Sequence, residues 1–184
     1  MSEKRQNSVG CPGYSRIMTP SVSPQFLRRV DSPIGRIELT GTDAAIVSLS
    51  IEKAGHLPHE AEPEHSNPVL EEAARQLAEY FAGTRHSFEL PLSPSGTEFQ
   101  KAVWQQLAEL DFGEATSYGE IGRATGRPSA ARAVGGAIGA NPLPIIVPCH
   151  RVLGADGRIT GYSGGNGIPT KSWLLDHEGI VLVA

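Results

Sequence analysis

The segment from Asn141 to Val152 (NPLPIIVPCHRV) constrains the fold more than any other part of the chain. Ile145–Val147 are β-branched residues that follow one another without a polar interruption, which predicts a strand buried on both faces. Pro148 has no N–H to donate, so it would end the pairing. The pattern therefore predicts that Cys149 lies at the end of a buried strand.

Cys149 itself has two interpretations. An unpaired cysteine is most often a small buried hydrophobe. A thiol beside an imidazole, here that of His150, can instead give up its proton and become a nucleophilic thiolate. Because so short a motif matches by chance easily, Pro-Cys-His alone leaves both interpretations open.

The composition is typical of a soluble globular protein. Of the 184 residues, 39% are hydrophobic and 20% are charged, and this length fits one large domain or two small ones. The N-terminus is polar, and no apolar run reaches the roughly 18 residues that a membrane span requires. We therefore expect an intracellular, cytoplasmic protein without a membrane partner.

The cysteine and histidine patterns predict neither a disulfide nor a metal site. A reducing compartment and a reactive role for one thiol argue against a bond between Cys11 and Cys149. The chain has no CxxC or Cys/His ligand spacing for zinc. His56, His59 and His65 could hold a metal, but their spacing fits no helix or hairpin and favours a solvated loop. We expect no metal and no cofactor.

The charge is distributed unevenly. The chain carries −4 overall, which argues mildly against nucleic-acid binding. The segment from Ile121 to Arg151, however, has no acidic residue, and a local basic surface is what contacts phosphates. Arginines on an exposed helix are also ordinary, so charge alone does not decide. The basic residues of this segment are Arg123, Arg127, Arg132 and Arg151.

The first half predicts a tail followed by a small sheet with one helix. Residues 1–25 are rich in Ser, Pro and Gly and predict a flexible tail. From Phe26, short apolar runs separated by SPIG and GTD turns predict an antiparallel meander. A helix from Pro68 to about Ala82, capped by Asn67, follows. Its predicted inward stripe is Val69, Ala73, Leu77 and Phe81, and we identify no chemistry in this half.

The second half begins with helix signals. Thr97–Gln100 and Ser117–Glu120 are capping boxes, and the second puts Tyr118 at the first position of a short helix. A turn at Gly126–Pro128 leads to a further helix from near Ser129, so the pair is a helix-turn-helix candidate. In the helix after the first box, the residues expected to face the core are Phe99, Val103, Trp104 and Leu107.

The helix expected after Ser129 has an almost bare surface. Between Ala130 and Ala140 it is built from Ala and Gly, and Arg132 is the long side chain that projects early. Glycines inside a helix cost roughly 1 kcal/mol each, so some benefit must offset them. Close approach to another backbone and tight helix packing against Val134 and Ile138 are both candidates, on opposite faces.

The C-terminal segment predicts a partner for the imidazole. After a glycine-rich stretch, TKSWLLDHEG forms a helix with Trp173, Leu174 and Leu175 apolar, and Gly179 stops it. Glu178, just before the stop, is then placed to meet His150.

Several motifs together resemble one known family. GTEFQKAVW, FGEATSYGE, AARAVGGAIGANP, IIVPCHRV, GYSGG and KSWLLDHEG occur in the order found in the O6-alkylguanine-DNA alkyltransferases, and the resemblance is strongest from Gly96 to Gly179. It implies an α/β fold with a ribonuclease-H-like domain over 26–91 and a mainly helical DNA-binding and alkyl-acceptor domain over 92–184, which contains a helix-turn-helix.

The resemblance also implies a reaction and the residues for it. Such proteins move an alkyl group irreversibly from O6-alkylguanine, and from O4-alkylthymine, in double-stranded DNA to their own cysteine after flipping the nucleotide. They act as monomers that can assemble side by side on DNA. The implied catalytic residues are the acceptor Cys149, the base His150 acting through a water, Glu178 and Asn141, which order it, and the proton donor Tyr118. The implied DNA contacts are Arg132, Ala131, Ala133, Gly135, Tyr118 and Arg151. The implied base pocket is Ile138, Val152, Tyr162 and Ser163.

Two observations keep alternatives open. The segment NGIPT, residues 166–170, is longer than the commonest family spacing and borders the pocket, so the accepted alkyl size is undetermined. A lesion sensor would share the fold but lack the cysteine, whereas a cysteine hydrolase would need an oxyanion site that the sequence does not reveal. A plain DNA-binding regulator would not need the PCHR motif.

Overall fold

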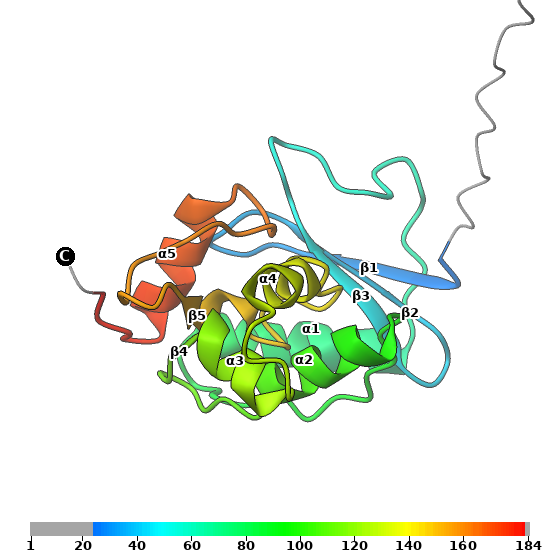
Figure 1. The fold of residues 1–184 in the computed structure, drawn as a ribbon. Coiled ribbons are helices and arrows are strands. Elements are labelled where there is room, and N and C mark those ends of the chain that lie inside the picture. The colour runs from blue at the N-terminus through cyan, green and yellow to red at the C-terminus, as the bar shows by residue number, and fades with distance from the viewer. Residues whose placement is uncertain (1–23, 183–184) are drawn as a thin grey trace, which may run out of the picture.

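The computed structural model describes residues 24–182, so Cys11 and almost all of the predicted tail lie outside the described part. Within it, a small sheet with one helix precedes a group of helices that surrounds the segment carrying Cys149 (Figure 1). Within residues 24–182, no helix is long and apolar enough to cross a membrane. The chain is therefore the mixed α/β protein that the sequence predicts.

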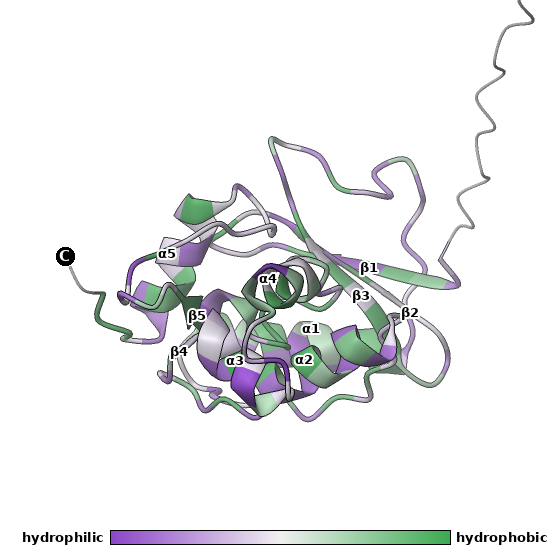
Figure 2. Ribbon diagram, viewed as in Figure 1, coloured by the Kyte–Doolittle hydropathy of each residue, from purple (hydrophilic) through white to green (hydrophobic). Residues whose placement is uncertain are grey.

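The N-terminal sheet is the predicted antiparallel meander. It consists of β1 (Phe26–Val30), β2 (Ile37–Gly41) and β3 (Ile46–Ile51) in the order β1-β2-β3. β2 is buried along its whole length because it pairs with both neighbours and is covered by α1 (Pro68–Phe81). Figure 2 shows hydrophobic stretches along these strands, whereas α2 and α3 alternate between hydrophilic and hydrophobic residues.

The helix α1 begins as predicted but turns a slightly different face inward. Asn67 Oδ1 accepts the Leu70 N–H at 2.9 Å, which is the predicted cap. Ala73 and Leu77 are buried, whereas Val69 and Phe81 are only half-buried. The buried face follows the spacing i, i+3, i+6, i+7 and i+10, and it consists of Leu70, Ala73, Gln76, Leu77 and Tyr80. This rotation points Tyr80 into the interior.

The second half is mainly helical. Its helices are α2 (Glu98–Ala108), α3 (Tyr118–Ala124), α4 (Ala131–Gly139) and α5 (Ile168–His177). Both predicted capping boxes are present at α2 and α3. In α2, Val103, Trp104 and Leu107 are buried as predicted, whereas Phe99 is half-buried under Arg127, whose guanidinium lies 4.5 Å from the ring centre. Trp104 Nε1 also donates to the Ala137 carbonyl at 2.8 Å, which fixes α4 on α2.

The helices α3 and α4 form the predicted helix-turn-helix. Gly126 adopts a left-handed φ of 70° in the turn. A Cβ on Gly122 would lie 3.0 Å from the Arg127 carbonyl oxygen, so only glycine allows this close approach. On α4, Val134 and Ile138 are buried, as predicted.

The prediction of a strand over Ile145–Val147 is wrong. These residues are buried, but Ile145 has a φ of 75°, and the chain curls into the 3-10 helix η1 (Cys149–Arg151). Pro142, Pro144 and Pro148 have no N–H groups, so this stretch cannot sustain a strand ladder. Only after η1 does β5 (Val152–Leu153) pair in parallel with β4 (Thr116–Ser117).

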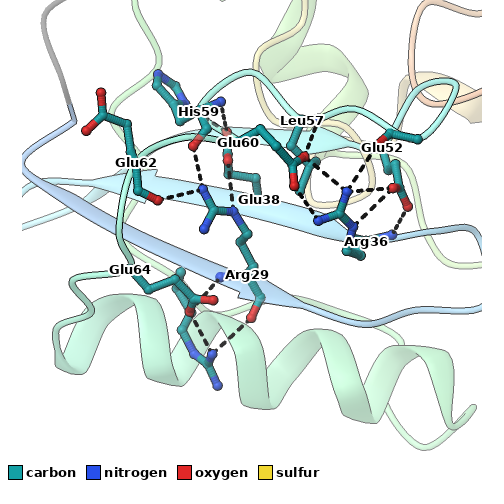
Figure 3. A network of polar contacts seen from close by, with 11 residues as sticks. Arg29, Arg36, Glu38, Glu52, Leu57, His59, Glu60, Glu62 and Glu64 are labelled. Carbon is teal, nitrogen blue, oxygen red and sulfur yellow. Dashed lines mark hydrogen bonds and ion pairs between the residues drawn. The ribbon is translucent and has the colours of Figure 1, made fainter.

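The histidine-containing loop between β3 and α1 is fastened to the sheet by ion pairs (Figure 3). Glu38 of β2 is buried and accepts hydrogen bonds from Arg29 Nε at 3.3 Å and from the ring of His59 at 2.7 Å. Arg36 binds both Glu52 and Glu60. This loop is therefore held in place by several contacts to β1 and β2.

Candidate active site

Cys149 lies at the wall of a small cavity in the C-terminal half. It is the first residue of η1, and only 3% of it is exposed. The cavity has a volume of about 230 Å³ and lies between the first turn of α3, one side of α4 and the glycine-rich loop. Its lining residues are Tyr118, Gly135, Ile138, Gly139, Cys149, Gly161, Tyr162 and Ser163.

The structure brings most of the predicted pocket together and leaves out one member. Ile138, Tyr162 and Ser163 line the cavity with Cys149. Val152 does not line it, because it is fully buried in β5, where it pairs with Thr116 of β4. The prediction that Val152 lines the pocket is therefore wrong.

The resting state of Cys149 is a protonated thiol. Burial raises the pKa of Cys149 above its usual value, and the side chains of Asn141 and Tyr162 and the charge of Lys171 oppose this shift. The Tyr162 hydroxyl acts on the thiol in this way although it has no hydrogen bond of normal geometry among the described residues. The sulfur therefore becomes a thiolate only when a base removes its proton.

His150 is placed to be such a base. Its ring is fully buried, and burial lowers its pKa, so the imidazole is neutral. Nε2 lies 2.8 Å from Glu178 Oε1, and since an ionised carboxylate can only accept, Nε2 carries the proton. Nδ1 is then unprotonated, and it has no hydrogen-bond partner in the described part of the chain. The ring therefore has one nitrogen free to accept a proton.

Glu178 is the most heavily hydrogen-bonded carboxylate of this site. Besides His150, it accepts hydrogen bonds from Arg151 Nε at 2.6 Å and Nη2 at 3.0 Å, and from the Tyr80 hydroxyl at 2.7 Å. Burial favours the neutral acid, but the hydrogen bonds from His150 and Arg151 outweigh it and lower the pKa of Glu178 to about 2. Glu178 is therefore ionised and held from several sides.

Arg151, which the resemblance implies as a DNA contact, is buried. Only 5% of Arg151 is exposed, because its guanidinium binds Glu178 and donates from Nη1 to the Leu110 carbonyl at 2.8 Å. A charge pattern along the sequence does not reveal a buried partner 27 residues away. Arg151 therefore holds Glu178 in the interior and does not lie on an exposed surface.

Tyr118 lines the cavity together with Cys149, and the Asn141 side chain lies close to the thiol. The Tyr118 hydroxyl accepts a hydrogen bond from Thr160 Oγ1 at 3.0 Å, which leaves its own proton free to be donated. Asn141 Nδ2 donates to the Val147 carbonyl at 2.8 Å, and Asn141 Oδ1 accepts the Leu143 N–H at 3.0 Å. Asn141 thus ties together the irregular segment that leads to Cys149.

The face of α4 next to the cavity is exposed and almost bare. Ala131, Arg132, Ala133 and Gly136 are exposed, and a Cβ added to Gly136 or Gly139 would meet no atom within 4 Å. Gly135 faces the cavity and lies against the Tyr118 ring. Arg123 and Arg127 are also exposed. The exposed face of α4 therefore carries one cation, Arg132, among small side chains.

Two buried residues of the site were not found from the sequence. Tyr80 comes from α1 in the N-terminal half, where we identified no chemistry. Lys171 of α5 is fully buried and donates from Nζ to the Val152 carbonyl at 2.5 Å, and burial lowers its pKa to about 8. A signal for Lys171 exists, since it shares the inward spacing of α5 with Leu174 and Glu178.

The fold and the site define a two-domain α/β protein in which a cysteine, backed by His and Glu, opens into a cavity beside a helix-turn-helix. Family models for the two halves match the chain. Residues 27–94 match the ribonuclease-like domain of 6-O-methylguanine DNA methyltransferase, and residues 98–180 match its DNA binding domain. The chain belongs to the 6-O-methylguanine DNA methyltransferase family.

Individual relatives agree with this assignment. The methylated-DNA–protein-cysteine methyltransferase of Methanosarcina acetivorans is 45% identical over 150 residues, covering 81% of this chain and 95% of that protein. The crystal structure of Mycobacterium tuberculosis O6-methylguanine methyltransferase has a TM-score of 0.74 and 43% identity, covering 83% of this chain and 92% of that one. A Mycobacterium tuberculosis structure in complex with DNA has a TM-score of 0.73 and 44% identity, with the same coverage.

Proposed function

We propose that this protein repairs alkylated DNA by moving the alkyl group from O6-alkylguanine, and from O4-alkylthymine, to Cys149. The observation that carries the proposal is the position of the thiol in a cavity of about 230 Å³ next to the bare, basic surface of α4. The related methyltransferases, including the one solved in complex with DNA, support it. The partner is double-stranded DNA inside the cell, bound by a monomer without a cofactor, and side-by-side assembly on DNA is compatible with it.

The cavity requires that the nucleotide leave the duplex. A base inside the stack is out of reach of a thiol that is 3% exposed, so the nucleotide must be rotated out at a cost of a few kcal/mol. Arg132 is exposed near the start of α4 and can fill the vacated space. Ala131, Ala133 and Gly136 let α4 approach the minor groove closely. Contacts of this kind reach phosphate and sugar, so they do not depend on sequence.

The transfer itself follows from the protonation states of the site. His150 Nδ1 takes the thiol proton through a bridging water, and a sulfur electron pair attacks the alkyl carbon. A C–S bond forms while the C–O6 bond breaks, and its electron pair goes to the guanine. Tyr118 donates a proton to the departing base and is reprotonated from the His150 side through solvent, so guanine leaves neutral. Ionised Glu178 stabilises the imidazolium that forms in between.

The product explains why one molecule acts once. A thioether has no good leaving group for water or His150 to displace, so Cys149 stays alkylated. The protein is therefore a reagent consumed by its reaction, and the amount of repair equals the amount of protein.

Intact mass spectrometry with a duplex containing O6-methylguanine tests the proposal. The expected result is a gain of one methyl group per molecule, located on Cys149 by peptide mapping, with no gain on an unmodified duplex. The control Cys149→Ala should bind the lesion and transfer nothing. Lesion binding without a mass change would instead identify a sensor, and repeated turnover of an ester or amide would identify a hydrolase. Either outcome would overturn the proposal.

A further inference from the structure

A tyrosine of the N-terminal domain reaches the catalytic carboxylate. Tyr80 lies on the buried face of α1, only 1% of it is exposed, and its hydroxyl donates to Glu178 Oε1 at 2.7 Å across 98 residues of sequence. The same oxygen accepts the hydrogen bond of His150 Nε2. Arg151 Nη2 is a third donor to this oxygen, at 3.0 Å. Because the three donors share one oxygen atom, a change in one bond acts directly on the others.

An unshared carboxylate would favour the protonated form of His150 before the reaction begins. A buried negative charge beside an imidazole favours the imidazolium, and an imidazolium has no free nitrogen to accept the thiol proton. Glu178 acts on His150 in this sense. Each further donor to the carboxylate disperses its charge and weakens that pull. Arg151 supplies two such donors, Nε to Oε2 and Nη2 to Oε1, and Tyr80 supplies a further one to Oε1, the oxygen that His150 uses.

The other titratable groups near this pair come from three elements. Lys171 on α5 and Arg151 on η1 both disfavour a proton on His150. Cys149 on η1 and Tyr162 of the glycine-rich loop are neutral at rest, since burial raises the pKa of each. The ring of His177 on α5 packs edge-on against the Tyr80 ring and bonds to the Tyr80 carbonyl, not to its hydroxyl. None of these contacts is removed when the Tyr80 oxygen is deleted.

We propose that Tyr80 is a positioning residue for the reaction, whose hydroxyl shares the charge of Glu178 and so keeps His150 neutral with Nδ1 ready to accept the thiol proton. This role rests on the proposed function of His150 as the base. It gives the N-terminal domain a part in the chemistry, because α1 is the element that delivers the hydroxyl. It also explains why a phenol, rather than a phenylalanine of the same shape, occupies the interior end of α1.

The test is the variant Tyr80→Phe in the full chain, with Gln76→Leu as the control. Gln76 is buried on the same face of α1 and holds Glu89 through hydrogen bonds of 2.9 and 3.1 Å, but it does not contact Glu178. Two measurements report the protonation of His150. They are the pH dependence of Cys149 alkylation by iodoacetamide and the titration of His150 by ¹⁵N NMR. We expect Tyr80→Phe to move both midpoints up by about one pH unit and to slow alkylation about tenfold below them.

The control separates this role from a merely structural one. Gln76→Leu should lower stability and leave both midpoints unchanged. If Tyr80→Phe fails to fold, 3-fluorotyrosine at position 80 retains the packing, donates more strongly, and should move the midpoints down. Unchanged midpoints in every variant would overturn the role of Tyr80 even if methyl transfer from DNA is normal. Shifted midpoints in a protein that removes no methyl group from DNA would leave the role of Tyr80 standing and overturn the proposed function.

Discussion

Residues 24–182 contain two buried glutamates, each bound to one arginine and one histidine, and only one of these clusters lies next to Cys149 in the chain. In the sheet cluster, Glu38 binds Arg29 and His59 (Figure 3). In the site cluster, Glu178 binds Arg151 and His150. The side chains of Glu38 and Glu178 are equally sealed, with exposures of 1% and 0%. The chemistry of the carboxylate therefore does not distinguish them.

The difference lies in the histidine and in what surrounds it. The His59 side chain is 24% exposed, and it fastens the loop before α1 to the sheet. The His150 side chain is fully buried and follows directly after the thiol in the chain. An imidazole that water can reach exchanges protons with solvent, whereas a sealed one exchanges them only with its neighbours. The same three residue types thus fasten a loop in one place and, under the proposed function, provide a proton acceptor in the other.

The largest expected difference between the clusters is in the transfer rate. His150→Gln removes the base, so single-turnover methyl transfer from a lesion duplex should fall about 10²- to 10⁴-fold. His59→Gln, the matched change in the sheet cluster, should leave the rate within about twofold. Equal losses of rate in both variants would contradict the comparison, because they would show that both histidines affect the transfer rate only by stabilising the fold.

The next difference is in the free energy of unfolding. Glu178→Gln leaves the nearly sealed Arg151 without a counter-charge and should cost about 3–5 kcal/mol, measured by urea denaturation. Glu38→Gln should cost only about 1–2 kcal/mol, because Arg29 is 16% exposed and also donates to the carbonyls of His59 and Glu62. Equal costs would mean that the two arginines depend equally on their carboxylates.

Acid should weaken the site cluster within a defined pH window. The pKa of Glu178 is lowered to about 2 in the folded protein, so its contribution to stability is complete above its usual value of 4.5 and is lost as the pH falls through 2. By linkage it amounts to about 3 kcal/mol. Urea midpoints between pH 5 and 2 should therefore fall less steeply in Glu178→Gln than in the parent protein. Identical slopes would assign the acid sensitivity to other groups.

The smallest effect should come from removing the contact between His59 and Glu38 alone. His59→Asn removes the ring contact to Glu38 and should cost about 0.5–1 kcal/mol, with faster proteolysis confined to the loop between β3 and α1. A thermal shift and limited proteolysis measure the two effects. Cleavage elsewhere in the chain would show that the contact between His59 and Glu38 stabilises more than this loop.

The elements that the sequence predicts correctly depend on neighbouring residues. The caps at Asn67, Thr97 and Ser117, the meander and the inward stripe of α4 all follow from signals within one turn or one strand pair. The meeting of His150 and Glu178 was also predicted, because a glycine stop marked the end of α5.

The failures have a common physical cause. The path from Asn141 to Cys149 depends on a left-handed Ile145 and on proline positions whose combined effect no periodicity describes. The burial of Arg151 and the reach of Tyr80 depend on partners far along the chain. A local pattern in the sequence indicates which face of a helix or strand is buried, but not which distant side chain each buried residue contacts.

The short parallel pairing of β4 with β5 has a mechanical consequence. Ser117, which opens the helix of Tyr118, pairs with Leu153, and Thr116 pairs with Val152, three residues beyond Cys149. Tyr118 directly follows one strand and Cys149 precedes the other by three residues, so this pairing joins the two backbone segments that carry the phenol and the sulfur. The pairing therefore restrains how far Tyr118 and Cys149 can move apart.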